Sequence, residues 1–150
     1  MIARLRLGLG DYREAERLLT AQSATIAWLP GPPASLRLAS TTDYGRTLHL
    51  LGRPAVCVTR MQPLEVDARR QQRQLPVQAA DFYSELGRCQ RDQRNPRTAR
   101  LLYQRSLELR RNTLDDTAGV VENLADLADL ERDAGIPKRR YWASATHWRS

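Results

Sequence analysis

Apolar residues recur along this chain at intervals of three to four positions, which is the spacing that places them on one face of an α-helix. Short turn-like breaks interrupt this helical pattern at nearly even intervals. The four breaks are Gly10-Asp11-Tyr12, Gly52-Arg53-Pro54, Arg94-Asn95-Pro96 and Gly135-Ile136-Pro137. Their first residues lie 42, 42 and 41 positions apart, and this regularity indicates an internal repeat.

Helices are expected on both sides of each break, because glycine can end one helix and proline can begin the next. The predicted helices span 1–9, 11–27, 36–51, 54–72, 77–93, 96–112, 115–134 and 137–148. Pro63 falls inside the fourth of these ranges. Proline in a helix interior costs about 3 kcal/mol, so Pro63 is expected to kink or end that helix.

Equivalent positions around the breaks carry small and large residues in a fixed order. Seven positions before each break stand the small residues Ala3, Gly45, Gly87 and Ala128, each preceded by a large one, Ile2, Tyr44, Leu86 and Leu127. After the first three breaks come the small Ala15, Cys57 and Ala99, and then the large Leu19, Met61 and Tyr103. Small residues let two helices approach closely, and large ones fill the adjoining space.

Some of these residues carry a resemblance to a known family. The segment with Leu86-Gly87, Asn95-Pro96, Ala99, Tyr103 and Ser106–Leu109 resembles one tetratricopeptide unit, and Asn123–Ala128 with Ala134-Gly135 resembles the opening of the next. The long period is similar to that of the kinesin-light-chain type and of repeat regions in bacterial signalling ATPases and transcription regulators.

The resemblance implies an all-α fold: an α-solenoid of antiparallel helix hairpins in a right-handed superhelix with about 3.5 repeats. We expect one repeat domain over 1–150. Its units are expected at 1–30 (incomplete), 36–73, 77–113 and 115–150, with a connector at 28–35.

The resemblance also implies a non-catalytic scaffold that binds an extended peptide in a concave groove lined by the first helix of each unit. Basic residues, and one acid, recur on these helices. Six positions before the breaks stand Arg4, Arg46, Arg88 and Asp129, and three positions further on are His49 and Arg91. Guanidinium groups bind carboxylates in a bidentate manner, so the pattern predicts an acidic peptide or the C-terminus of a protein as the partner. The alternative is an ordinary charged helix face in an arginine-rich sequence.

Net charge suggests a second interpretation. The formal charge is +7, and between 60 and 111 arginines outnumber acids. This stretch, with Arg69-Arg70 and Arg110-Arg111, resembles a nucleic-acid footprint. Nucleic acid is the weaker alternative, because Tyr83 and Tyr103 are needed in the predicted core and the acidic stretch 115–133 would repel phosphates.

Several classes of protein are not expected. No apolar run approaches the roughly 18 residues of a membrane span, and we expect a cytoplasmic protein. Cys57 and Cys89 are far apart and form no CxxC pair, so neither a disulfide framework nor a zinc site is predicted, and both cysteines are interpreted as structural core residues. His49 and His147 belong to no catalytic motif, and no cofactor and no enzyme activity are expected.

The two ends of the sequence give further expectations. Only the last part of a first helix precedes the first break, which leaves an apolar edge at Ile2, Leu5 and Leu9. We expect either a piece of a longer repeat protein, such as a signalling ATPase or transcription regulator, or self-association through this edge. Trp142 and Trp148 are expected to pack on the preceding helix.

Overall fold

The computed structural model describes residues 10–28 and 33–135, and this part of the protein is helical throughout, without strands. The all-α prediction is therefore confirmed. The helices are α2 (Tyr12–Trp28), α3 (Ala34–Leu50), α4 (Pro54–Met61), α5 (Glu65–Gln71), α6 (Pro76–Asp92), α7 (Pro96–Leu109) and α8 (Thr117–Asp133). The helices predicted at 1–9 and 137–148 lie outside the described residues.

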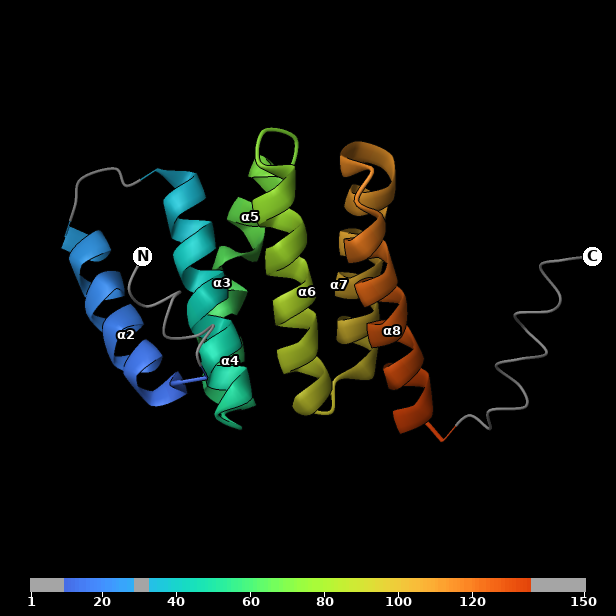
Figure 1. The fold of residues 1–150 in the computed structure, drawn as a ribbon, viewed down its shortest axis with the longest axis horizontal. Coiled ribbons are helices and arrows are strands. Elements are labelled where there is room, and N and C mark those ends of the chain that lie inside the picture. The colour runs from blue at the N-terminus through green and yellow to red at the C-terminus, as the bar shows by residue number, and fades with distance from the viewer. Residues whose placement is uncertain (1–9, 29–32, 136–150) are drawn as a thin grey trace, which may run out of the picture.

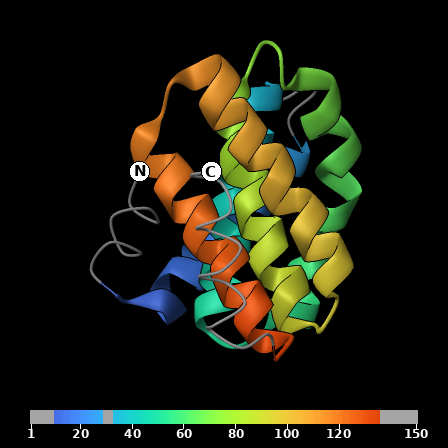
Figure 2. The ribbon, with the colours of Figure 1, turned by 90° about the vertical axis from the view of Figure 1, so that its right-hand side faces the viewer.

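The helices form an array of hairpins, as expected for a solenoid (Figure 1). In this view α3, α6 and α8 stand side by side, with α4, α5 and α7 behind them. Helix α3 contacts α2 and α4, α6 contacts α5 and α7, and α7 contacts α8, while α3 and α4 also contact α6. The end-on view shows the helices in two layers, with α8 on one side and α4 and α5 on the other (Figure 2).

The first residues of the four sequence breaks share one backbone conformation. Gly10, Gly52, Arg94 and Gly135 have φ values of 78°, 71°, 61° and 75°. The left-handed region that they occupy costs glycine little, and this explains its use at three of the four turns.

The small and large residues of the repeat meet inside the hairpins. A Cβ added to Gly87 on α6 would come within 2.6 Å of Tyr103 Cε1 on α7, and one added to Gly45 on α3 would collide with the side chain of Met61 on α4. Ala15, Cys57 and Ala99 are fully buried. Leu127 packs against the cluster of Ala99, Tyr103 and Leu130, while Ala128 is half-buried and Ala3 lies outside the described residues.

Two helices are interrupted. Pro63 lies in a 3₁₀ turn, Gln62–Leu64, that separates α4 from α5, so the predicted break is confirmed. After α7 comes a π-helical turn, Arg110–Leu114. Asp115 then adopts a left-handed conformation, and the carboxylate of Asp116 caps α8 by accepting a 2.9 Å hydrogen bond from the Gly119 amide.

The expectation that the cysteines are unpaired was wrong. Cys57 on α4 and Cys89 on α6 form a disulfide with a Cα–Cα distance of 6.1 Å. Cys57 stands five residues after one break and Cys89 five residues before the next, and the stacking of α6 on the preceding hairpin brings these positions together. Their separation of 32 residues hid this contact from a search for short-range motifs.

Candidate functional site

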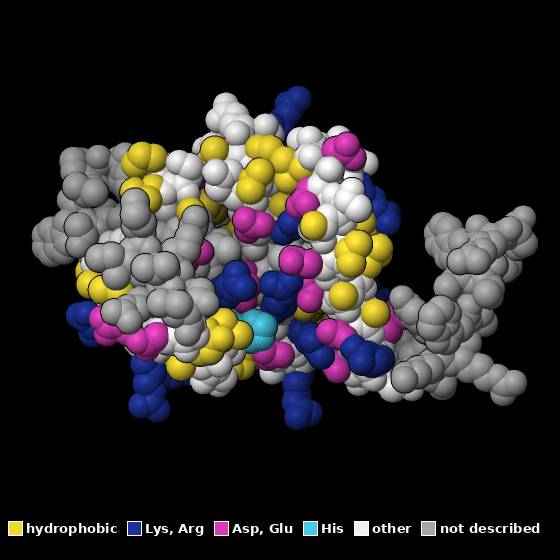
Figure 3. Space-filling model, in the orientation of Figure 1, with side chains coloured by type: hydrophobic (Ala, Val, Ile, Leu, Met, Phe, Trp, Pro, Cys, Tyr) yellow, Lys and Arg dark blue, Asp and Glu magenta, His cyan; other side chains and the backbone are white. Residues whose placement is uncertain are grey.

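The predicted groove residues lie on α3, α6 and α8, whose shared surface we call the first-helix face. Arg46 and His49 are on α3, Arg88 and Arg91 on α6, and Asp129 on α8. Arg4, the sixth predicted residue, lies outside the described residues. In Figure 3 the cyan side chain of His49, in the last turn of α3, lies in the lower half of this face, near basic and acidic side chains.

His49 connects α3 to α6 through both ring nitrogens. Nδ1 lies 3.0 Å from Glu85 Oε1, and Nε2 lies 3.1 Å from Asp92 Oδ2. The hydrogen bond to Glu85 raises the pKa of His49 against the opposing effects of burial and of Arg88, and the charges of Glu85 and Asp92 act in the same direction as that bond. A protonated imidazole can donate to both carboxylates at once.

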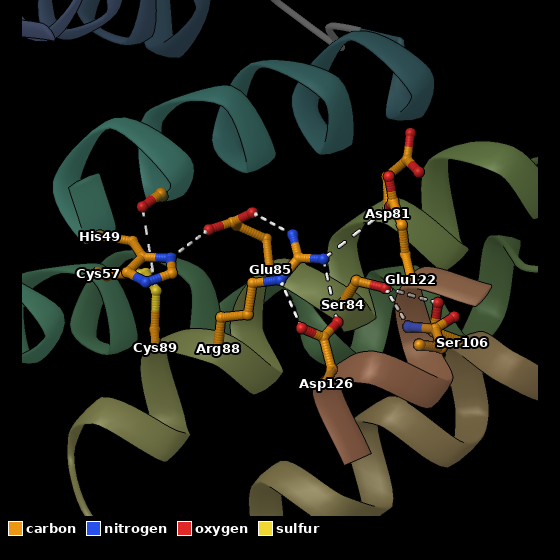
Figure 4. A network of polar contacts seen from close by, with 12 residues as sticks. His49, Cys57, Asp81, Ser84, Glu85, Arg88, Cys89, Ser106, Glu122 and Asp126 are labelled. Atoms are coloured by element: carbon orange, nitrogen blue, oxygen red, sulfur yellow. Dashed lines mark hydrogen bonds and ion pairs between the residues drawn. A yellow bond between two sulfur atoms is a disulfide. The ribbon is translucent and has the colours of Figure 1, made fainter. Parts of the chain in front are cut away.

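Arg88 connects α6 to α8. Its Nε and Nη2 bind the two oxygens of Asp126 at 3.2 and 3.0 Å, and its Nη1 lies 3.3 Å from Glu85 Oε2 (Figure 4). Burial by itself would lower the pKa of Arg88, but the hydrogen bonds and charge of Asp126, with the charge of Glu85, raise it overall. Arg88 is therefore a firmly charged link between neighbouring units.

Arg91 makes a similar connection one helical turn further along α6. Its guanidinium binds both oxygens of Asp133 on α8, at 2.5 and 3.2 Å. The hydrogen bond from Arg91 also lowers the pKa of Asp133. Asp129, which the sequence pattern grouped with the arginines, lies 3.7 Å from Arg91 Nη1 and pairs with Arg132. These contacts hold α6 and α8 together.

Arg46 differs from its repeat equivalent Arg88. Its side chain is exposed on α3, and among the described residues it forms no ion pair. Arg88 pairs with Asp126 of the next unit. One repeat earlier, the position equivalent to Asp126 is Glu85, and Glu85 is already engaged by His49 and Arg88. Among the described residues predicted for this face, Arg46 thus carries a guanidinium without an ion pair, beside basic groups that are paired with acids.

Sequence reasoning missed the acidic residues that pair with these basic residues. Asp43, Glu85 and Asp126 stand nine positions before successive breaks, at spacings of 42 and 41. Glu85 accepts from His49 of the preceding unit, and Asp126 accepts from Arg88 of the preceding unit. The spacing was visible in the sequence and could have indicated pairing between units.

A buried polar network lies behind this face, between α6, α7 and α8. Ser84 Oγ is 2.7 Å from Ser106 Oγ and accepts from Asn123 Nδ2 at 2.9 Å. Arg110, itself buried, donates to Ser106 and lies 2.9 Å from Asp81 and 2.8 Å from Asp116. Burial raises the pKa of Asp81 even though Arg110 opposes it. Arg110 is therefore not free to bind phosphate.

One cluster has the donor atoms of a metal site. Oxygen, nitrogen and sulfur atoms of Glu85, His49 and Cys89 lie within 4.8 Å of one another. Glu85 and Cys89 are buried and His49 is partly buried, and the Cys89 sulfur is bonded to Cys57. No sequence motif indicated this cluster, because the fold brings its members together from α3 and α6.

Among the described segments, no helix combines the length and the apolar character needed to cross a membrane. No curated protein and no solved structure matches the sequence. Residues 83–117, which include most of α6, all of α7 and the start of α8, match the family model of the tetratricopeptide repeat. The protein therefore carries a tetratricopeptide repeat within an all-helical array, and this repeat is in general a protein-interaction module.

Proposed function

We propose that the protein is a non-catalytic scaffold that binds a protein or peptide partner on the first-helix face. The repeat at 83–117 supports an interaction role, and the 42-residue spacing supports assignment to the long-period, kinesin-light-chain-like type. The observation that carries the proposal is the state of Arg46, an exposed guanidinium on α3, whereas Arg88 and Arg91 on α6 are engaged by acids of α8.

An acidic segment is the partner chemistry that this arrangement favours. A peptide carboxylate can bind Arg46 in a bidentate manner without displacing a carboxylate of the protein itself. At Arg88 or Arg91 it would have to compete with Asp126 or Asp133, each already held through two oxygens. Of the predicted basic residues that the structure describes, Arg46 is thus the one left to bind a partner, while Arg88 and Arg91 join successive units.

A cavity of about 460 Å³ at the end of this face offers a place for an adjoining side chain. Leu130 and Pro96 supply its apolar lining, and Arg91 and Asp133 its charged rim. A peptide bound to Arg46 on α3 would have to cross α6 to reach this cavity. Such a combination of one charged contact with one apolar contact is usual for peptide recognition.

The nucleic-acid alternative has less support. Within its basic stretch, Arg110 is buried between two aspartates, and Arg69 and Arg105 both pair with Glu65. Tyr83 and Tyr103 are fully buried and offer no exposed ring for base stacking.

The test uses fluorescence anisotropy with a labelled peptide rich in Asp and Glu, and with its Asn and Gln counterpart. We expect the acidic peptide to bind the wild-type protein and the neutral one to bind at least about tenfold more weakly. Arg46→Glu should abolish binding, while Arg100→Glu, an equal change of charge on an exposed position of α7, should retain it. If both variants lost peptide binding equally, binding would depend on net charge alone, and the proposal would be overturned.

A further inference from the structure

We propose that the Cys57–Cys89 pair, once reduced, forms a Zn²⁺ site together with His49 and Glu85. This inference goes beyond the proposed scaffold function and does not depend on it. Sulfur atoms bonded to each other cannot also be thiolate ligands, so the oxidised protein and the metal-bound protein are alternative states of one buried cluster.

The donor set fits zinc. Thiolate, imidazole and carboxylate are its usual protein ligands, and four of them give a closed tetrahedral site. The bond lengths of such a site imply about 3.3–3.8 Å between donor atoms. Atoms of His49, Glu85 and Cys89 already lie within 4.8 Å of one another, and Cys57 Sγ is bonded to Cys89 Sγ. Movements of about 1 Å would bring the donor atoms of His49, Glu85 and Cys89 to these distances, and reduction frees Cys57 Sγ to move away from Cys89 Sγ.

The groups around the cluster resemble a second coordination shell. A zinc-binding histidine generally donates its free ring N–H to a carboxylate, and His49 Nε2 lies 3.1 Å from Asp92 Oδ2. This contact leaves Nδ1, which faces Glu85, as the metal-binding nitrogen. The second oxygen of Glu85 is held by Arg88 at 3.3 Å, so Oε1 is oriented towards the cluster (Figure 4).

The chemistry balances with a dithiol reductant, the class that keeps thiols reduced in cytosol. The dithiol gives two electrons and two protons to the Cys57–Cys89 bond and becomes a disulfide itself, leaving two protein thiols. Binding of Zn²⁺ then releases one proton from each thiol, and a further one from His49 Nδ1 when the ring is protonated. Both cysteines are fully buried, so the bound cation supplies the charge that two buried thiolates require.

The test is a titration of the full-length protein with Co²⁺ and then Zn²⁺, after reduction with a phosphine and under argon. We expect the reduced protein to bind one Co²⁺ with a thiolate-to-cobalt charge-transfer band and tetrahedral d–d bands, and Zn²⁺ to displace it. The oxidised protein should show neither band. Binding by the oxidised protein, or none by the reduced protein, would overturn the proposal.

Variants distinguish zinc binding by the four proposed ligands from zinc binding by the two cysteine thiols alone in a partly unfolded protein. His49→Gln and Glu85→Gln keep both cysteines and can be folded in the oxidised state first, with helicity checked by circular dichroism. Each should weaken Zn²⁺ affinity at least about tenfold. Glu108→Gln, the same change at an exposed position of α7, should bind as the wild type does. If the His49 and Glu85 variants also bind Zn²⁺ with wild-type affinity, the cysteines alone hold the metal and the site does not exist as proposed.

Discussion

Arg94 is the one turn residue of the repeat that lacks the freedom of glycine. Its φ of 61° matches those of Gly10, Gly52 and Gly135, and its side chain is exposed without an ion pair among the described residues. A non-glycine residue in this region costs about 1 kcal/mol, and here no visible contact offsets that cost.

We therefore expect Arg94→Gly to raise the free energy of unfolding by about 0.5–1 kcal/mol, measured by urea denaturation. The reciprocal change Gly52→Arg should lower it by a similar amount, because nothing lies within 4 Å to clash with or to support a side chain there. A loss of stability in Arg94→Gly would show that the arginine makes a compensating contact.

At the residue scale the sequence predicted backbone features better than side-chain environments. Pro63 and the four breaks were readable because proline and glycine constrain the backbone directly. Arg110 was misjudged as part of a basic surface. Its neutralisation depends on Asp81, 29 residues earlier, and on the π-helical turn that directs the backbone back towards α6. Neither has a local signature.

At the scale of elements, two bidentate pairs join α6 to α8 in different surroundings. The side chains of Arg88 and Asp126 are 26% and 13% exposed, whereas that of Asp133, the partner of Arg91, is 52% exposed. Charge pairs lose strength as solvent screens them, so the inner pair should contribute more to stability.

Double-mutant cycles test this ranking. With Arg88→Met and Asp126→Leu we expect a coupling free energy of about 1–3 kcal/mol, and with Arg91→Met and Asp133→Leu less than about 1 kcal/mol. Chemical denaturation of the four variants of each cycle supplies the values. Equal coupling in the two cycles would mean that burial does not govern the strength of these links.

His49 makes the α3–α6 contact sensitive to pH. Its pKa is higher in the folded protein than the unfolded value of about 6.5, chiefly because of the hydrogen bond to Glu85. The resulting stabilisation is complete below the unfolded pKa and is lost as pH rises through the folded pKa. We expect the free energy of unfolding to fall over this window in the wild type, and His49→Gln to lack that component in the same denaturation series. If the free energy of unfolding of His49→Gln changed with pH as steeply as that of the wild type, the titrating group would be a residue other than His49.

The existence of the helices between residues 11 and 134 followed from the sequence, but the pairing of their charged side chains did not. The spacing of Arg46 and Arg88 predicted that they occupy equivalent positions on successive first helices. In the structure they lie on α3 and α6, which contact each other. Whether such a residue meets solvent or a carboxylate of the next unit depends on which other side chains reach that carboxylate. Arg88 pairs with Asp126, whereas Glu85, the equivalent acid for Arg46, is held by His49 and Arg88.

At the scale of the whole molecule, the Cys57–Cys89 bond joins two successive hairpins of a nearly one-dimensional array. In such an array each unit is stabilised mainly by its neighbours, so a covalent link acts on one junction more than on the rest. The bond closes a loop of 32 residues, for which the loss of conformational entropy in the unfolded state corresponds to about 3–4 kcal/mol.

We therefore expect metal-free reduction, or the variant with Cys57→Ala and Cys89→Ala, to lower the free energy of unfolding by about 3–4 kcal/mol in urea. Hydrogen exchange followed by mass spectrometry should locate the effect. Amides of α4 and α6 should lose more protection than those of α8, because the disulfide joins α4 to α6, whereas α8 packs mainly on α7. If protection falls equally from α2 to α8, the array unfolds as a single cooperative unit, and the disulfide stabilises the whole array rather than the junction between two hairpins.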